Sequence, residues 1–144
     1  GHARPAVRTD PRPGRPLAGV SGPIAVGVDI VDVERIRTAM TRTPALLDRV
    51  YTPGELAYCH AAADPSERLA ARWAAKEATV KCLGGGVPGL DLRAIEIVRG
   101  ADGAPSLVVV GEAATRAAER GIGSWLVSLS HTSTLAQAVV IASE

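Results

Sequence analysis

One lysine limits how this chain can fold, because it interrupts the apolar stripe of the strongest predicted helix. The segment from Arg72 to Lys81 reads RWAAKEATVK, and Lys76 lies near its middle. At about 100° per residue, the lysine side chain projects among four apolar ones. These four are Leu69, Trp73, Val80 and Leu83. Burying an unpaired ammonium group costs several kcal/mol, so we expect Lys76 to meet an anionic ligand or a counter-charge.

The opposite face of the same helix is made of small side chains, which allow close packing on a second neighbour. They are Ala70, Ala71, Ala74, Ala75 and Ala78. Ser66 is expected to cap the start of this helix, and the glycines from Gly84 to Gly86 are expected to end it. A helix with two packing faces belongs at the centre of a fold.

The rest of the sequence predicts strands and shorter helices around the long one. Residues 25–33 alternate like a strand, and Thr52-Pro53-Gly54-Glu55 has the pattern of a helix start with a capping box. The other predicted helices cover 34–41, 44–50 and 112–120, and the other strands cover 92–99, 106–110, 125–130 and 136–142. This order predicts an α+β fold in which an antiparallel sheet packs on one long helix.

Composition argues against several classes of protein. The 144 residues include no Phe, two Trp and two Tyr, so small aliphatic side chains must form the core, and oligomerisation is a natural supplement. A net charge of +1 without a basic block argues against nucleic acid as a partner. No apolar run is long enough to span a membrane and no signal-peptide pattern is visible, so we expect a cytoplasmic protein. Cys59 and Cys82 are expected to be buried thiols.

The first 23 residues differ from the rest of the chain. They contain five prolines among Arg, Gly and Ala, without periodicity. Such a composition cannot bury enough apolar surface to offset its chain entropy, so we predict a disordered Pro/Arg-rich arm over residues 1–23. Gly1-His2 resembles a cloning remnant. A single folded domain is predicted over residues 24–144.

Two carboxylates on separate predicted elements are the candidate metal ligands. Asp29 interrupts an apolar strand, and Glu77 lies at the edge of the apolar helix stripe. A lone strand Asp is more often structural, but two rigidly held carboxylates could bind one Mg²⁺, whose other ligands are water and phosphate oxygens. Lys81 follows Glu77 by one helical turn. It could form an ordinary ion pair with Glu77, or contact a phosphate together with Lys76.

Two further groups of residues each allow two interpretations. Gly84 and Gly85 could simply end the helix, or their amides could approach a phosphate or a nucleotide. His131 and Thr132 lie at a predicted hairpin tip, where they could be turn residues or donors to an anion.

Arginines recur every seven residues after the first strand, at Arg35, Arg42 and Arg49. Pro44 interrupts this region, so only Arg35 and Arg42 are expected on one helix face. They could form a solvated surface, or a docking strip for an acidic helical protein, since surface charge steers the encounter of two proteins.

Four segments share their order and spacing with one known family. They are Gly27-Val28-Asp29-Ile30 with Arg35-Ile36, Tyr51-Thr52-Pro53-Gly54-Glu55, Arg72-Trp73-Ala74-Ala75-Lys76-Glu77-Ala78 with Lys81, and Ser128-Leu129-Ser130-His131 with Ala136 and Ala138. Together they resemble the holo-acyl-carrier-protein synthase family of 4′-phosphopantetheinyl transferases. Each segment alone is weakly specific, but four in order are strong, and they span about residues 24–142.

The resemblance implies the fold of that family and a Mg²⁺-dependent reaction. In this reaction the phosphopantetheine arm of coenzyme A passes to a serine of an acyl carrier protein, as in fatty acid biosynthesis, and adenosine 3′,5′-diphosphate is released. The carrier serine would attack the β-phosphorus in line, with Glu77, Asp29 or a metal-bound water as its base. The family forms homotrimers with active sites between subunits.

The resemblance also implies a role for each candidate residue. Glu77, Lys81 and Asp29 would be catalytic, with Asp29 and Glu77 as the metal ligands. The coenzyme A contacts would be Lys76, Lys81, Gly84, Gly85, His131 and Thr132, and the carrier would dock on Arg35 and Arg42. Two other functions stay open: a different Mg²⁺-dependent phosphotransferase or phosphohydrolase, and a non-catalytic oligomeric module that docks an acidic protein.

Overall fold

The computed structural model describes residues 22–86 and 88–144. Its elements are, in chain order, β1 (Pro23–Asp32), α1 (Val33–Arg42), α2 (Ala45–Val50), α3 (Pro53–His60), α4 (Ser66–Cys82), the 3₁₀ turn η1 (Leu92–Ala94), β2 (Ile95–Arg99), β3 (Pro105–Val109), α5 (Gly111–Glu119), β4 (Ser124–His131) and β5 (Leu135–Ser143). The predicted disordered arm lies outside the described residues, except for Gly22 and Pro23.

A three-stranded antiparallel sheet forms one layer of the fold, with the strand order β1-β5-β4. The middle strand pairs with both neighbours, so that Val139 lies opposite Val28 of β1 and opposite Ser128 of β4. β2 and β3 form a separate antiparallel hairpin. The predicted α+β class is confirmed, with the strands divided between two sheets.

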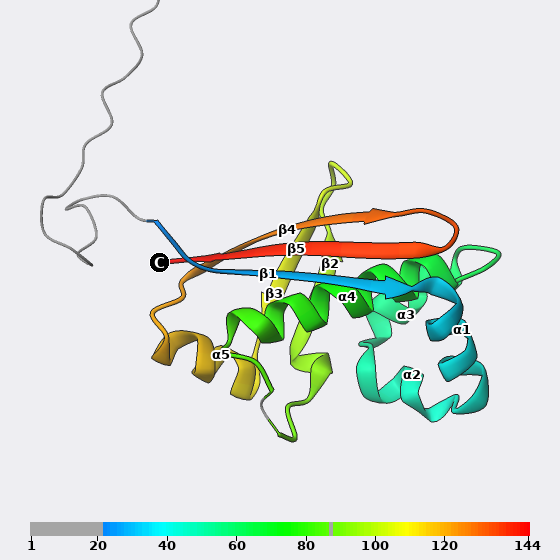
Figure 1. The fold of residues 1–144 in the computed structure, drawn as a ribbon, viewed down its shortest axis with the longest axis horizontal. Coiled ribbons are helices and arrows are strands. Elements are labelled where there is room, and N and C mark those ends of the chain that lie inside the picture. The colour runs from blue at the N-terminus through cyan, green and yellow to red at the C-terminus, as the bar shows by residue number, and fades with distance from the viewer. Residues whose placement is uncertain (1–21, 87) are drawn as a thin grey trace, which may run out of the picture.

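The helix α4 runs along the three-stranded sheet and packs against β1 and β5 (Figure 1). Both of its predicted packing faces contribute to the core: the alanines are buried, and so are Leu69 and Leu83. The two elements approach each other closely at Gly27 of β1, where a Cβ atom would lie 1.9 Å from Ala78 O. Only a residue without a side chain permits this approach. Asp29 follows on the same face of the strand and is thereby held beside α4.

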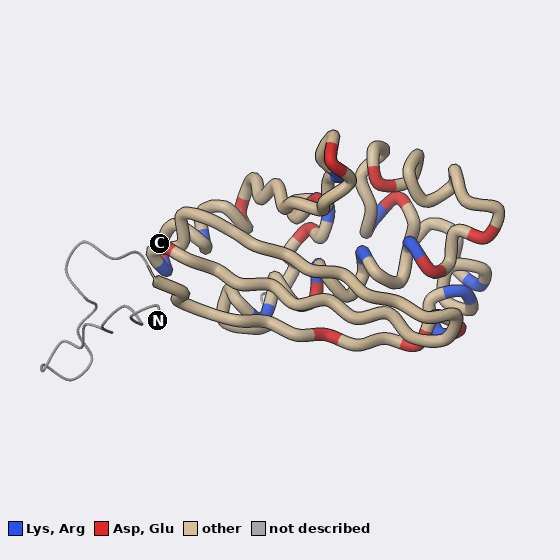
Figure 2. Tube along the Cα trace, turned by 90° about the horizontal axis from the view of Figure 1, so that it is seen from above, with Lys and Arg blue, Asp and Glu red and all other residues tan. Residues whose placement is uncertain are grey.

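No described element covers the other face of the three-stranded sheet. We call this apolar surface, formed by Ile24, Val26, Val28, Ile30 and Leu126, the uncovered sheet face. Val26 and Leu126 are 65% and 68% exposed. Figure 2 shows that the Lys, Arg, Asp and Glu residues gather on the helical side, and within the three strands Asp29 and Asp32 are the only residues of these four types. A contiguous exposed apolar patch of this kind marks an interaction site.

Of the two helix starts predicted from Thr52 and Ser66 as capping residues, one is confirmed. Glu55 N donates to Thr52 Oγ1 at 3.2 Å, and Thr52 N donates to Glu55 Oε1 at 2.9 Å, which is the predicted capping box. Ser66 does not cap α4 as predicted. It is the first helical residue, and its N–H donates to Asp64 Oδ1 at 3.0 Å, so the aspartate satisfies the amide at this helix start. Within the described ranges, no helix has the length and apolar character needed to cross a bilayer.

Candidate active site

Asp29, Glu77 and Lys81 come together where β1 passes α4. Lys81 Nζ donates to Val28 O at 2.6 Å and to Asp29 Oδ1 at 3.3 Å. The side chain of Lys81 is about half exposed, and that of Asp29 is 20% exposed. Among the described residues, Lys81 therefore forms its ion pair across to β1, and not with Glu77 along the helix.

We call Asp29 and Glu77 the acid pair. Partial burial and the Asp29 carboxylate raise the pKa of Glu77, and the Lys81 ammonium opposes this shift. Two carboxylates that repel each other in a half-buried position suit a hard cation, and Mg²⁺ commonly takes one or two carboxylates while phosphates and water complete its shell. In the part of the chain that the structure describes, no third His, Cys, Asp or Glu joins them in a metal-binding group. The acid pair thus fits Mg²⁺ together with oxygen ligands from a substrate or from water.

Lys76 is fully buried, as its place in the apolar stripe predicts, and its counter-charge is Glu55 of α3. Lys76 Nζ donates to Glu55 Oε1 at 2.8 Å, to Leu92 O at 2.9 Å and to Ile95 O. Burial lowers the pKa of Lys76, and the Glu55 carboxylate opposes that effect. All three N–H donors of this ammonium group are used inside the protein. We therefore correct the expected contact with coenzyme A and assign Lys76 a structural role.

Gly84 and Gly85 end α4, and their amides are not directed to a ligand. Both residues have positive φ angles, 100° and 81°. Gly84 N donates to Lys81 O at 3.1 Å and Gly85 N donates to Val80 O at 3.0 Å. This is the arrangement of a helix C-terminus closed by residues in the left-handed region. We therefore correct the expectation that these two amides contact a phosphate. The two glycines end the helix, which was the alternative interpretation.

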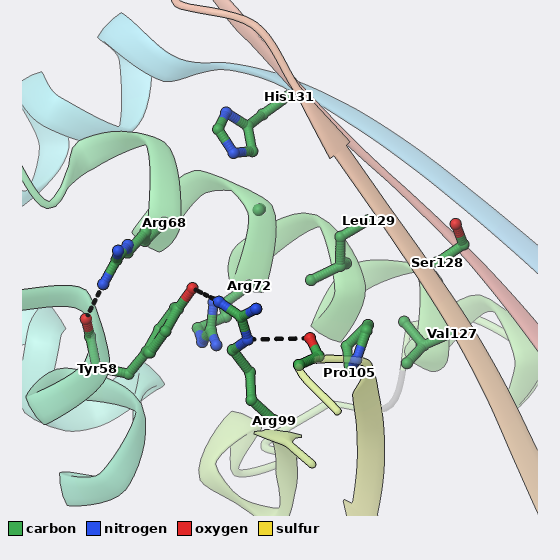
Figure 3. A pocket seen from close by; sticks show the side chains of 11 residues that line it. Tyr58, Arg68, Arg72, Arg99, Pro105, Val127, Ser128, Leu129 and His131 are labelled. Carbon is green, nitrogen blue, oxygen red and sulfur yellow. Dashed lines mark hydrogen bonds between the residues drawn. The ribbon is translucent and has the colours of Figure 1, made fainter. Parts of the chain in front are cut away.

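A pocket of about 310 Å³ lies between α4 and β4. Arg68 and Arg72 of α4 and Arg99 at the end of β2 line it, around the ring of Tyr58 from α3 (Figure 3). We call this the arginine pocket. None of these four residues was predicted from the sequence to line a site. The one-turn spacing of Arg68 and Arg72 is a signal that could have indicated a basic face, whereas Tyr58 and Arg99 arrive only through tertiary packing.

His131 also lines the arginine pocket, at the end of β4, and its Nδ1 lies 3.3 Å from Glu67 Oε2. Thr132 lies in the turn that follows. Its hydroxyl oxygen accepts from Thr134 N at 3.2 Å and from Leu135 N at 3.0 Å. The structure therefore places His131 where a ligand in the pocket can reach it, while the Thr132 hydroxyl stabilises the turn between β4 and β5.

Arg35 and Arg42 of α1 are both exposed, and among the described residues neither forms an ion pair. Arg37, which lies between them in the sequence, is instead bound to Glu34 and to Asp64. The two arginines predicted to share a face are therefore the ones on this helix whose charge is available to a partner.

The acid pair and the arginine pocket lie at opposite edges of the three-stranded sheet. Asp29 belongs to β1, whereas Val127 and Leu129, which line the pocket, belong to β4, and β5 runs between these two strands. Neighbouring strands are about 4.8 Å apart, so two strand spacings, about 10 Å, separate the edges. Within one chain, β5 runs between β1 and β4, and α4 contributes residues to both sites.

Known proteins are similar to this chain in both sequence and fold. The model of the 4′-phosphopantetheinyl transferase superfamily matches residues 25–138. A holo-[acyl-carrier-protein] synthase of Frankia casuarinae is 46% identical over 119 residues, which are 83% of this chain and 96% of that protein. The structure resembles the holo-[acyl-carrier-protein] synthase of Neisseria meningitidis with a TM-score of 0.75 at 33% identity, covering 85% of this chain and 100% of that chain. It also resembles the Helicobacter pylori enzyme in complex with coenzyme A, with a TM-score of 0.72 at 31% identity, covering 82% of this chain and 99% of that chain. The chain therefore belongs to the holo-[acyl-carrier-protein] synthase family of the 4′-phosphopantetheinyl transferase superfamily.

Proposed function

We propose that the acid pair and Lys81 form the reactive centre of this chain, which transfers the 4′-phosphopantetheine arm of coenzyme A to a serine of an acyl carrier protein. The observation that supports this assignment is the convergence of Asp29, Glu77 and Lys81 from two separate elements. Family membership supports the reaction, and the H. pylori relative binds coenzyme A.

The residues of the reactive centre have distinct roles. Asp29 and Glu77 would hold Mg²⁺ through their carboxylate oxygens, and bound Mg²⁺ offsets the negative charge of the coenzyme A diphosphate. Lys81 is half exposed, so its ammonium group can exchange Asp29 for a phosphate oxygen. The serine oxygen forms a bond to the β-phosphorus while the bond to the bridging oxygen breaks, and the serine proton passes to Glu77, Asp29 or a water molecule. Lys81 then stabilises the charge on the departing adenosine 3′,5′-diphosphate.

The arginine pocket suits the part of coenzyme A that does not react. Besides its diphosphate, coenzyme A has a phosphate monoester on the ribose, which is close to doubly charged at neutral pH. We assign this ribose phosphate to the arginine pocket, because guanidinium groups match the geometry and charge of a phosphate. His131 is the proposed neighbour of the nucleotide on the β4 side.

We propose a homotrimer with active sites between subunits. In this arrangement the β1 edge of one copy meets the β4 edge of the next, and one coenzyme A molecule contacts the acid pair of one copy and the arginine pocket of the other. Repeated head-to-tail contacts close into a ring when the rotation between copies allows it. The uncovered sheet face supports this assembly, because it supplies apolar surface for the subunits to bury.

The carrier protein is proposed to dock on α1. This helix begins directly after β1, so Arg35 lies close in sequence to Asp29. Arg35 and Arg42 present exposed positive charge that suits an acidic helix of the carrier. The cytoplasmic location stays a prediction from the composition, and the role in fatty acid biosynthesis stays a prediction from the resemblance.

The reaction is tested by incubating the protein with coenzyme A, Mg²⁺ and apo acyl carrier protein, and by measuring the mass of the carrier. We expect a carrier with phosphopantetheine attached. Asp29→Ala and Glu77→Ala should abolish the modification while the circular dichroism spectrum is kept. Arg93→Ala, which alters an exposed ion pair outside both sites, serves as the control. Unmodified carriers across several candidates would contradict the function, and full activity in either carboxylate variant would overturn the metal assignment.

The two alternative functions give different results in the same experiment. A phosphohydrolase would cleave coenzyme A when no carrier is present. A docking module would leave the carrier unmodified and would bind it equally well with Glu77→Gln.

A further inference from the structure

Tyr58 lies at the centre of the arginine pocket, with three positive charges around its ring. The Cζ atoms of Arg72, Arg68 and Arg99 lie 4.1, 4.2 and 5.2 Å from the ring centroid. At such distances the electron-rich face of an aromatic ring attracts a cation. The ring therefore offsets part of the mutual repulsion of the three guanidinium groups.

Tyr58 also fixes two of the arginines by hydrogen bonds (Figure 3). Arg68 Nη1 donates to Tyr58 O at 2.7 Å, and Arg99 Nη1 donates to the Tyr58 hydroxyl oxygen. Arg99 is held from its other side by Gly103 O, which accepts from Arg99 Nε at 3.1 Å. Arg72 differs from these two: it is only 3% exposed, and its Nε is buried without a hydrogen-bond partner. Its stacking on Tyr58 is therefore what orients it.

Among the described residues, no acidic side chain neutralises this cluster through an ion pair. Within residues 22–86 and 88–144, none of the three arginines forms an ion pair with Asp or Glu, although Arg37 and Arg93 each do. Guanidinium groups form strong hydrogen bonds to phosphate oxygens. Three unpaired ones, gathered from two elements on one ring, make a phosphate site whose donors are ordered before the ligand arrives.

We infer that Tyr58 is the positioning residue that makes this pocket selective for a coenzyme A that has its ribose phosphate. This inference rests on the proposed assignment of the ribose phosphate to the arginine pocket. Tyr58 lies on α3, away from the acid pair, so it acts on the binding of the nucleotide and not on the reacting phosphorus. A coenzyme without the ribose phosphate gains nothing from the clustered arginines.

The test compares the affinities for coenzyme A and for dephospho-coenzyme A, which lacks the ribose phosphate, by titration calorimetry. The unaltered protein should bind coenzyme A at least about tenfold more tightly. Tyr58→Leu removes the ring and should weaken coenzyme A binding about tenfold while the affinity for dephospho-coenzyme A is unchanged. Tyr58→Phe keeps the ring and should keep most of the preference. The kcat at saturating coenzyme A should be unchanged in both variants.

Tyr51→Phe is the matched control. The Tyr51 hydroxyl donates to Leu69 O at 2.8 Å, and this residue does not line the arginine pocket, so the variant should lower the Tm and leave the preference unchanged. If Tyr58→Leu leaves the preference for coenzyme A unchanged, for example by weakening the binding of both coenzymes equally, the role of Tyr58 is overturned. The assignment of the ribose phosphate to the pocket would still stand. Equal binding of the two coenzymes by the unaltered protein would overturn both.

Discussion

A single buried ion pair joins three elements of this molecule. Lys76 of α4 meets Glu55 of α3, and both side chains also bind the backbone around β2. Lys76 Nζ donates to Leu92 O and Ile95 O, while Glu55 Oε2 accepts from Ile97 N at 3.1 Å. The attraction in such a pair is largely offset by the cost of desolvating both charges, but removing one partner leaves the other charge buried and unpaired. The pair therefore adds little net stability, but α3, α4 and β2 must pack correctly for both charges to be satisfied.

Replacing only Lys76 should show how much the fold depends on this pair. We expect Lys76→Met to lower the free energy of unfolding by about 3–5 kcal/mol, because the Glu55 carboxylate stays buried without its partner. The double variant Lys76→Met with Glu55→Gln should recover part of that loss. Urea unfolding measures both. Arg93→Met breaks an exposed pair with Asp91 and should cost at most about 1 kcal/mol; an equal loss in the two single variants would contradict the explanation.

The thiol of Cys59 should be unreactive in the folded protein. It is buried on α3, and this burial raises its pKa to about 11. Since the thiolate is the reactive form, iodoacetamide at about pH 8 should leave Cys59 unmodified until denaturant is added. Mass spectrometry of the alkylated protein measures this. Modification at the rate of a free cysteine in native buffer would show that α3 opens readily.

The burial of Lys76 could be predicted from its helix stripe, but its partner could not. Glu55 is the N3 residue of a recognisable capping box, and that local role is confirmed. Its second role depends on how α3 packs on α4, and periodicity within one helix does not contain that information. For the same reason Tyr58 and Arg99 were missed, while Asp29, Glu77 and Lys81 could be selected from their unusual places in apolar elements.

Among the elements, the contact between β1 and α4 determines the geometry of the acid pair. Gly27 allows the strand backbone to approach the helix, and Asp29 follows two residues later on the same face. A methyl group at residue 27 would have to push these two elements apart, because the atoms it meets are backbone atoms of Ala78.

Gly27→Ala should therefore affect both stability and metal dependence. We expect it to lower the free energy of unfolding by about 1–3 kcal/mol, as overpacking does, and to raise the Mg²⁺ concentration needed for half-maximal activity. Urea unfolding and a Mg²⁺ titration of carrier modification measure the two effects. Gly22→Ala, where a Cβ atom meets nothing within 4 Å, is the control. If the variant is destabilised but its Mg²⁺ requirement is unchanged, the close approach of β1 to α4 does not determine the metal site.

Most element boundaries could be predicted from turn and capping residues. The break at Pro44 is confirmed, since α1 ends at Arg42 and α2 begins at Ala45. The predicted strand over 92–99 was too long, because its first residues form the 3₁₀ turn η1 before β2. The cause is local: Asp91 Oδ1 accepts from Arg93 N at 3.0 Å and caps the turn. Alternating side chains alone do not distinguish such a turn from a strand.

For the whole molecule, the separation of the acid pair from the arginine pocket predicts complementation between defective subunits. Glu77→Ala removes one half of the proposed site and Arg72→Ala removes the other. Co-expressed chains with two different tags, purified through both, should regain activity at one of the three interfaces of each mixed trimer, where two intact halves meet. Carrier modification measures this.

The control mixture pairs Glu77→Ala with Asp29→Ala. Both changes damage the same half of the site, so every interface keeps a defective acid pair and no activity should return. Failure of the first mixture to recover activity, despite confirmed mixed oligomers, would place the complete site within one chain.

In the proposed homotrimer, the placement of the two half-sites at opposite sheet edges would also make activity depend on how many chains are present. A newly made chain would then hold two halves of different sites and no complete one. The concentration of active enzyme rises more steeply than the concentration of protein until assembly is complete. Dilution below that threshold would switch off modification of the carrier without any inhibitor or covalent change.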